Sequence, residues 1–158
     1  MRTIDATDKR ILNLLQENAK YTIKEIASQL GMSTTPVYER IKRLEDQAYI
    51  TSYTAIIDKK KLGYKLVAFC NVQLKEHAQE YLIRFESEAW KLEEVVECYH
   101  IAGMYDYLLK IVISDMEAYQ NFIVNKLAKL QNIGNVQSAF VMSEIKNSTV
   151  LVLEAPND

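Results

Sequence analysis

The stretch TIKEIASQLGMSTTPVYERIKRL, residues 22–44, predicts two short helices joined by a tight turn. Thr22 can cap the first helix, and Glu25 three positions later can bond back to it and complete a capping box. Gly31 supplies the left-handed position at which that helix ends. Ser33 can cap the second helix, and Pro36 stands in its first turn, where the missing N–H costs nothing. This pattern is a helix-turn-helix.

The outer face of the second helix has the chemistry of a DNA-contacting surface. At about 100° per residue, Val37, Ile41 and Leu44 gather on one side and predict the buried face. The other side carries short hydroxyls at its N-terminal end, an aromatic ring and cations, which suit base edges and phosphates. A charged face that is merely solvated is the alternative. The residues predicted to contact DNA are Thr34, Thr35, Tyr38, Glu39, Arg40, Lys42 and Arg43.

Charge is divided unevenly along the chain. The net charge is −2, but residues 1–65 carry 12 Lys and Arg against 8 Asp and Glu, whereas residues 66–158 carry 7 against 13. A basic segment that contains a helix-turn-helix, attached to an acidic segment, suggests that contact with nucleic acid is confined to the first.

Composition favours a soluble cytoplasmic protein. The chain has 158 residues, enough for one medium or two small domains, and lacks an apolar run of 18 residues. The two cysteines, Cys70 and Cys98, lie in alternating apolar runs and are expected to be buried thiols rather than a disulfide or metal ligands. We expect no metal, no cofactor and no membrane partner.

The helix-turn-helix is predicted to belong to a three-helix domain over residues 1–50. A preceding helix begins at Asp5, with Asp8 near the positive end of its dipole. Residues 49–57 are rich in β-branched and aromatic side chains and predict a short strand or wing. The segment DKKKLGY at 58–64 is polar and contains Gly63, so residues 51–64 are interpreted as strand and linker.

Residues 65–158 predict a second domain with strands and helices in the order β-α-β-β-α-β. The expected strands cover 66–75, 95–102, 105–113 and 136–142, and the helices cover 78–92 and 115–130. Units of this kind close into a four-stranded antiparallel sheet with both helices on one face, a ferredoxin-like sandwich of the α+β class. Ser114 and Glu117 are expected to cap the second helix, and residues 148–154 to add an edge strand.

The face of this sheet away from the helices is also partly apolar. Val67 and Phe69 point opposite to the core-facing residues of the first strand, and Leu108 and Val112 do so in the third. A one-layer sandwich leaves such a face wet unless a partner covers it. We therefore predict a homodimer formed through this face.

The segment between the two middle strands, residues 102–106, has two interpretations. One is a hairpin loop in which Gly103 takes positive φ and Asp106 bonds nearby backbone. The other is a small-molecule site, because backbone N–H groups at a glycine turn can hold a carboxylate and Asp106 can meet an ammonium group. An α-amino acid has both groups. His100 lies near this loop, and a lone histidine in a strand is more often structural than catalytic.

The combined features resemble one family, the Lrp/AsnC (leucine-responsive, or feast/famine) transcriptional regulators. The resemblance rests on IDATDKRILNLLQENAKYTIKEIASQLGMSTTPVYERIKRLEDQAYI at 4–50, LGY at 62–64, ECYHIAGMYDYLLKI at 97–111 and AFVMSEIK at 139–146. It implies a winged helix-turn-helix, a ferredoxin-like effector domain, a linker strand exchanged between subunits, dimers that assemble to octamers, and amino-acid effectors. By resemblance, the effector-binding residues are Gly103, Met104, Tyr105 and Asp106, with Ser138 and Phe140 nearby.

The leading hypothesis is a sequence-specific DNA-binding transcriptional regulator, not an enzyme, whose assembly or affinity is modulated by a small molecule. Two alternatives stand beside it. The same architecture resembles that of sirohaem decarboxylases, which act on a tetrapyrrole, but only His77 and His100 are available for such chemistry. The other alternative is an amino-acid sensor that does not bind DNA.

Overall fold

Contacts divide the chain into two compact units. The computed structural model describes residues 4–154; the first unit comprises residues 4–56 together with 146–154, and the second comprises residues 57–145. Each unit has its own hydrophobic core. Among the helices of the described residues, none is both long and apolar enough to cross a membrane.

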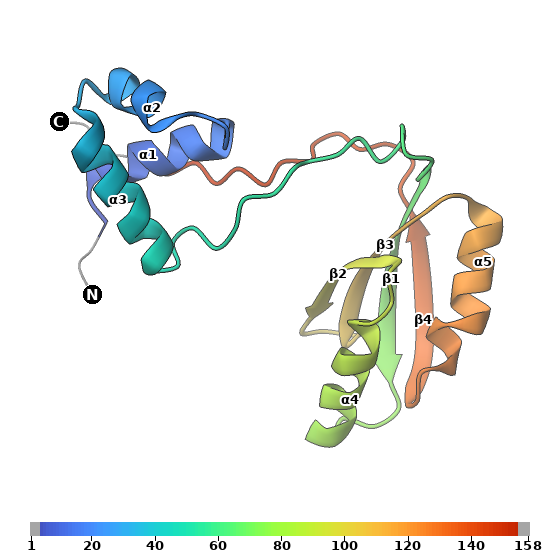
Figure 1. The fold of residues 1–158 in the computed structure, drawn as a ribbon. Helices are drawn as coiled ribbons and strands as arrows, with labels where there is room; N and C mark the ends of the chain where they lie inside the picture. The colour runs from blue at the N-terminus through green and yellow to red at the C-terminus, as the bar shows by residue number, and fades with distance from the viewer. Residues whose placement is uncertain (1–3, 155–158) are drawn as a thin grey trace. The chain divides into compact units, whose positions relative to one another are not determined.

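The first unit is built on three helices, α1 (Ala6–Glu17), α2 (Ile23–Leu30) and α3 (Thr34–Asp46) (Figure 1). Their apolar stripes recur at helical spacing and meet in a small core. Its buried residues are Ile11, Leu12, Ile26, Ala27, Val37 and Leu44. The structure thereby confirms the three predicted helices and the predicted core-facing residues of α3.

Capping residues fix where the first two helices begin and where α2 ends. Asp5 and Asp8 form a reciprocal capping box at α1, and Thr22 and Glu25 form one at α2. Gly31 ends α2 in the left-handed conformation, with φ of 66°. The tight turn into α3 therefore follows from local sequence. Ser33 is the N-cap residue of α3, but its side chain makes no capping hydrogen bond.

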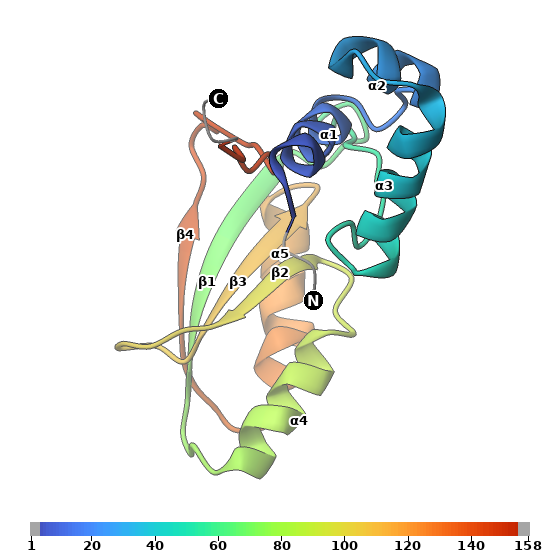
Figure 2. The ribbon, with the colours of Figure 1, turned by 90° about the vertical axis from the view of Figure 1, so that its left-hand side faces the viewer.

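The second unit is a four-stranded antiparallel sheet with two helices on one face (Figure 2). The elements follow in the order β1 (Leu66–Leu74), α4 (Gln79–Ala89), β2 (Val95–His100), β3 (Tyr107–Ile113), α5 (Met116–Asn125), a 3₁₀ turn (Leu127–Lys129) and β4 (Ile133–Phe140). The strands are arranged β2-β3-β1-β4. This is the predicted ferredoxin-like fold of the α+β class.

The core of the second unit lies between the sheet and its helices. Alternate residues of β1 and β3 point into it, because side chains alternate between the faces of a strand. The largest fully buried side chains there are Tyr107, Phe85, Phe122, Leu109, Ile111 and Leu127. The opposite face, called the open face below, carries the intervening residues of each strand. These are Val67, Phe69 and Asn71 on β1, Leu108, Lys110 and Val112 on β3, Glu97 and Tyr99 on β2, and Gln137 and Ala139 on β4.

Two predicted strands are absent. Neither residues 49–57 nor residues 148–154 form a strand, because among the residues that the structure describes neither range pairs with the four-stranded sheet. Two smaller expectations were also wrong. Asp115, not Ser114, caps α5, with its carboxylate accepting the amide of Ala118 at 2.8 Å. Cys70 is buried as predicted, but Cys98 is exposed, since β2 is an edge strand.

Two tyrosines are expected to resist ionisation at high pH. Burial, together with hydrogen bonds to Glu86 and to Cys70, raises the pKa of Tyr107 and Tyr119 respectively well above the ordinary value. Their stabilising contribution is therefore complete below a pH of about 10 and is lost as the pH rises above it, because the unfolded chain ionises first. Absorbance at 295 nm during alkaline titration should show a late step that coincides with unfolding.

The variant Tyr107→Phe should shrink that late step and flatten the alkaline dependence of the unfolding free energy. The control is Tyr64→Phe, which replaces an exposed tyrosine of the linker and should leave the late step unchanged. Ionisation of all tyrosines before any loss of structure would contradict the expectation.

Candidate DNA-contacting and ligand-binding residues

The outer face of α3 presents five of the seven predicted DNA-contacting side chains to solvent. All five are exposed, and at about 100° per residue they fall within an arc of roughly 140°. They are Thr34, Thr35, Tyr38, Glu39 and Lys42. The face is accessible to a large partner and offers hydroxyl, aromatic, carboxylate and ammonium groups along about two and a half turns of helix.

The other two predicted residues, Arg40 and Arg43, lie on the flank of α3 and are held by aspartates at the start of α1. One nitrogen of Arg40, Nη1, donates to Asp5 at 2.6 Å and to Asp8 at 2.7 Å. Nη2 of Arg43 donates to both carboxylate oxygens of Asp8 at 2.7 Å. Asp8 is 1% exposed, so its charge is compensated almost entirely by these two guanidinium groups. The remaining guanidinium nitrogens are left for other acceptors.

This ion-pair cluster joins residues 32 to 35 positions apart in sequence. The sequence predicts Asp5 as a helix cap and Asp8 as a first-turn residue near the positive end of the helix dipole, and nothing in the spacing indicates their second role. Burial acts to raise the pKa of Asp5, but hydrogen bonds from Arg40 and from the Asp8 amide outweigh it and leave that pKa below its ordinary value. Asp5 therefore stays charged at neutral pH, and the ion pairs fix α3 against α1.

The loop between β2 and β3 holds four of the predicted effector residues. Gly103 has φ of 142°, a conformation that favours glycine, and Met104 is 79% exposed. The carboxylate of Asp106 accepts the Leu74 amide at 2.7 Å and lies 3.0 Å from Nε2 of His77. Asp106 thus joins the loop to the end of β1. Tyr105 donates its hydroxyl to Gln137 on β4.

Ser138 lies on the helix-covered side of the sheet, apart from Tyr105 and Gln137. Its hydroxyl accepts a hydrogen bond from Tyr119, and the thiol of Cys70 lies 2.9 Å from the same tyrosine oxygen. The register places Gln137 on the open face and Ser138 on the other. Within this single chain, the predicted effector residues are not gathered around one cavity. His100 stacks on Tyr107, with ring centroids 4.8 Å apart.

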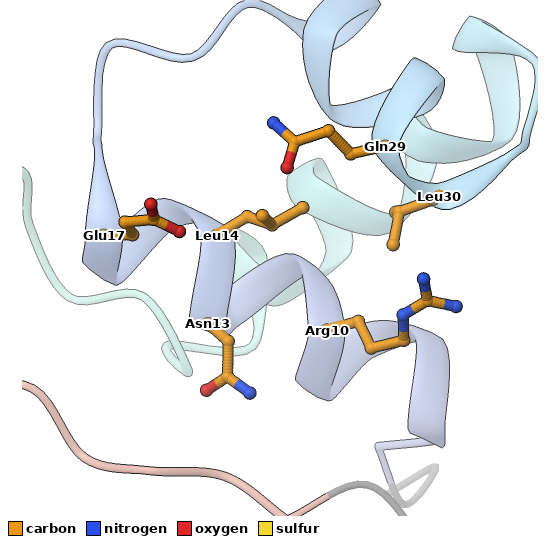
Figure 3. A pocket seen from close by; sticks show the side chains of 6 residues that line it. All are labelled: Arg10, Asn13, Leu14, Glu17, Gln29 and Leu30. Carbon is orange, nitrogen blue, oxygen red and sulfur yellow. The ribbon is translucent and has the colours of Figure 1, made fainter.

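A depression of about 270 Å³ lies between α1 and α2 (Figure 3). Arg10, Leu14 and Leu30 are among its lining residues, and the set is completed by Asn13, Glu17 and Gln29. None of them is a predicted effector residue. Among the described residues, no group of three or more His, Cys, Asp or Glu side chains is arranged to hold a metal ion.

The two units together define a class of protein. A trihelical unit with an exposed α3, joined to a ferredoxin-like unit, is the architecture of a DNA-binding regulator with a separate sensing domain. Family models agree: the AsnC-type helix-turn-helix domain matches residues 4–45, and the Lrp/AsnC ligand binding domain matches residues 67–151. The chain belongs to the Lrp/AsnC family of transcriptional regulators.

Individual relatives cover nearly the whole chain. The leucine-responsive regulatory protein of Escherichia coli K12 is 35% identical over 153 residues, which are 97% of this chain and 93% of the relative. A transcriptional regulator of Neisseria meningitidis, solved as its L-methionine complex, has a TM-score of 0.90 and 34% identity, with 94% of this chain and 96% of that one covered. An AsnC family regulator of Agrobacterium tumefaciens gives a TM-score of 0.89 and 36% identity over the same shares.

These matches confirm the predicted family, fold and function: the chain is a DNA-binding transcriptional regulator of the small-molecule-responsive type. The individual DNA-contacting and effector residues remain predictions.

Proposed function

We propose that this regulator binds operator DNA through the exposed face of α3, as a dimer on two-fold symmetric sites, and that an amino acid modulates its binding. The observation that carries the proposal is the exposed face itself. That face carries hydroxyl groups at the N-terminal end of α3, and an aromatic ring and a lysine further along the helix. A helix in the major groove places its N-terminal residues at base edges.

Different residues of α3 are assigned different roles. Thr34, Thr35, Tyr38 and Glu39 are proposed to contact base edges, and Lys42 to contact phosphate. Arg40 and Arg43 are proposed to contact phosphate as well, through the guanidinium nitrogens that the aspartates leave over. Their side chains are 24% and 31% exposed, which supports a contact from the flank of the helix.

Thr35→Ala is expected to change which sequences are bound, whereas Lys42→Ala is expected to change how tightly all sequences are bound. A lost base contact should relax the preference at one position by about 1–3 kcal/mol and leave the salt dependence intact. A lost phosphate contact should reduce the slope of log affinity against log salt by about 0.9. Each variant is the control for the other. Identical effects of the two on specificity and slope would contradict the assignment.

The effector is proposed to be an amino acid bound near the loop at residues 103–106. The Neisseria relative holds L-methionine, and the loop here supplies a glycine turn whose backbone N–H groups suit a carboxylate. Asp106 is already bonded to Leu74 and His77, so binding an ammonium group there requires sharing its oxygens. Ser138 is proposed to assist from β4.

Thermal-shift screening of the twenty amino acids tests this part. A ligand at 100 times its Kd should stabilise the protein by about 2.7 kcal/mol. The thermal shift should disappear in Gly103→Val, which strains the backbone of the loop at a positive φ. It should persist in Gly63→Val, which makes the same change at a linker glycine with φ of 89°. If the thermal shift persists in Gly103→Val, the amino acid binds elsewhere on the protein.

The open face of the sheet is proposed as the dimer interface, and dimers are proposed to assemble further to octamers in the cytoplasm. Phe69, Leu108 and Val112 are only half buried within one chain, and they lie on neighbouring strands. Covering them with the same face of a second copy forms a two-fold interface. Two α3 helices are then available to one operator.

Catalysis is not part of the proposal. His77 bonds to Asp106 and His100 stacks on Tyr107, so each has a structural partner. Purified protein that turns over a tetrapyrrole would favour the decarboxylase alternative. Failure to bind any genomic fragment at low salt would favour the DNA-free sensor.

A further inference from the structure

A stripe of three polar residues runs along one face of α1. Lys9, Asn13 and Gln16 are spaced i, i+4 and i+7, which places them on one side of a helix. The extended segment 150–154 of the same chain lies against this stripe and runs antiparallel to α1 (Figure 1). Figure 3 shows the Asn13 amide turned toward this segment and away from Leu14 and Leu30.

Each amide side chain of the stripe bonds to the backbone of one residue in the segment. Asn13 donates to the carbonyl of Leu153 at 3.0 Å and accepts its N–H at 3.3 Å. Gln16 donates to the carbonyl of Leu151 at 2.9 Å and accepts its N–H at 2.8 Å. Lys9 donates to the carbonyl of Glu154 at 2.9 Å.

These five hydrogen bonds form a pattern that selects an extended chain. In a strand, the N–H and C=O of one residue point to the same side, and those of the next residue point to the other. An amide side chain offers one acceptor and one donor at matching positions, so it can pair with every second residue. Leu153 adds an apolar contact, because it packs on the core of the first unit.

We propose that this face of α1 is a docking site for an extended peptide, and that its occupant is the segment 150–154 of the same chain. The site recognises the backbone of the peptide and, in addition, one apolar side chain, that of Leu153. The chain leaves the first unit after residue 56 and returns to it at residue 146. Docking therefore gives the first unit a second attachment besides the 51–57 segment, formed by hydrogen bonds and separable without unfolding either core.

Amide hydrogen exchange tests the docking residue by residue. The amides of Leu151 and Leu153 should exchange at least about tenfold more slowly than that of Val152, whose N–H points away from α1. Gln16→Ala should speed exchange at Leu151, and Asn13→Ala should do so at Leu153. Alanine is a good helix former, so α1 itself should persist.

Arg10→Ala is the control, since Arg10 lies on α1 outside the stripe, and it should leave both amides slow. Equal exchange of Leu151, Val152 and Leu153 in the wild type would overturn the docking site. So would protection that both alanine variants retain.

A cross-link identifies the chain that supplies the segment. Gln16→Cys with Leu151→Cys, in a Cys98→Ser background, is treated with a short bis-maleimide, which spans the distance that the Gln16 side chain bridges in the wild type. A cross-link within single chains supports the proposed occupant. A covalent dimer would assign the segment to a second copy, and the absence of any cross-link would overturn docking. Neither readout depends on DNA, so a failure of the proposed function would leave both results standing.

The consequence for operators does rest on the proposed function. With the segment detached in Asn13→Ala/Gln16→Ala, the first unit is held by one connection only. Binding should then tolerate half-site spacings that the wild type rejects, at unchanged affinity for a single half-site.

Discussion

Replacing Asp8 with alanine is expected to unfold the first unit at temperatures where the second unit stays folded. Asp8 is buried, bonds to both Arg40 and Arg43, and completes the capping box with Asp5. Removing one partner of a buried ion pair costs about 3–5 kcal/mol, and the lower end applies here because Arg40 and Arg43 are partly exposed and Arg40 keeps Asp5. A unit of roughly 60 residues has a total stability of about 3–9 kcal/mol. The substitution therefore removes a large part of that stability, and loss of the capping hydrogen bonds at the start of α1 adds to the cost.

Asp46→Ala is the matched control. Asp46 is exposed in the last turn of α3, where a negative charge is unfavourable to the helix dipole, so its removal should be neutral or slightly stabilising. Far-UV circular dichroism and calorimetry would report a separate early transition for Asp8→Ala only. A single transition at the wild-type temperature for Asp8→Ala would contradict the role given to the cluster.

Placing a carboxylate on the open face is expected to separate the dimer and weaken operator binding about 100-fold or more. Phe69 lies between Lys110 and Ala139 in neighbouring strands, and Phe69→Asp sets two charges against each other across a two-fold interface. The side chain is only partly buried within one chain and lies outside the core of the second unit, so the fold should survive. A dimer that binds two half-sites at once has an affinity about 10²–10⁴ higher than that of a single contact, and a monomer loses this gain.

Sedimentation and operator titration measure the two effects together. Val124→Asp makes the same change at an exposed apolar residue on α5, away from the open face, and should leave the dimer intact. If the Phe69→Asp variant still sediments as a dimer and binds the operator as tightly as the wild type, the open face is not the dimer interface.

Features encoded by neighbouring residues were predictable from sequence. Thr22 with Glu25, and Asp5 with Asp8, specify helix starts within four residues, and Gly31 specifies a helix end. The alternation in β1 and β3 specified which side chains form the core of the second unit. These elements depend on local backbone preferences and periodicity, which a single sequence displays.

Features that depend on distant partners were not predictable. Arg40 was assigned to DNA without knowledge that Asp5 and Asp8, more than 30 residues earlier, hold it. The segment 148–154 has a strand-forming composition, but its hydrogen bonds go to side chains of α1 instead of to a sheet. Composition reports a preference for extended backbone and does not identify the group that satisfies its hydrogen bonds.

The most direct test of the central claim is selection of bound genomic fragments by the wild type and by a variant of the α3 face. Thr34→Ala/Thr35→Ala/Tyr38→Ala changes exposed residues only, so the fold should be retained. The wild type should enrich a two-fold symmetric motif with half-sites spaced by whole helical turns, about 34–36 Å or a multiple of it. The variant should lose the motif and keep only salt-sensitive, non-specific binding. Enrichment of the same motif by both proteins, or of no motif by the wild type, would contradict the assignment of α3 as the DNA-contacting element.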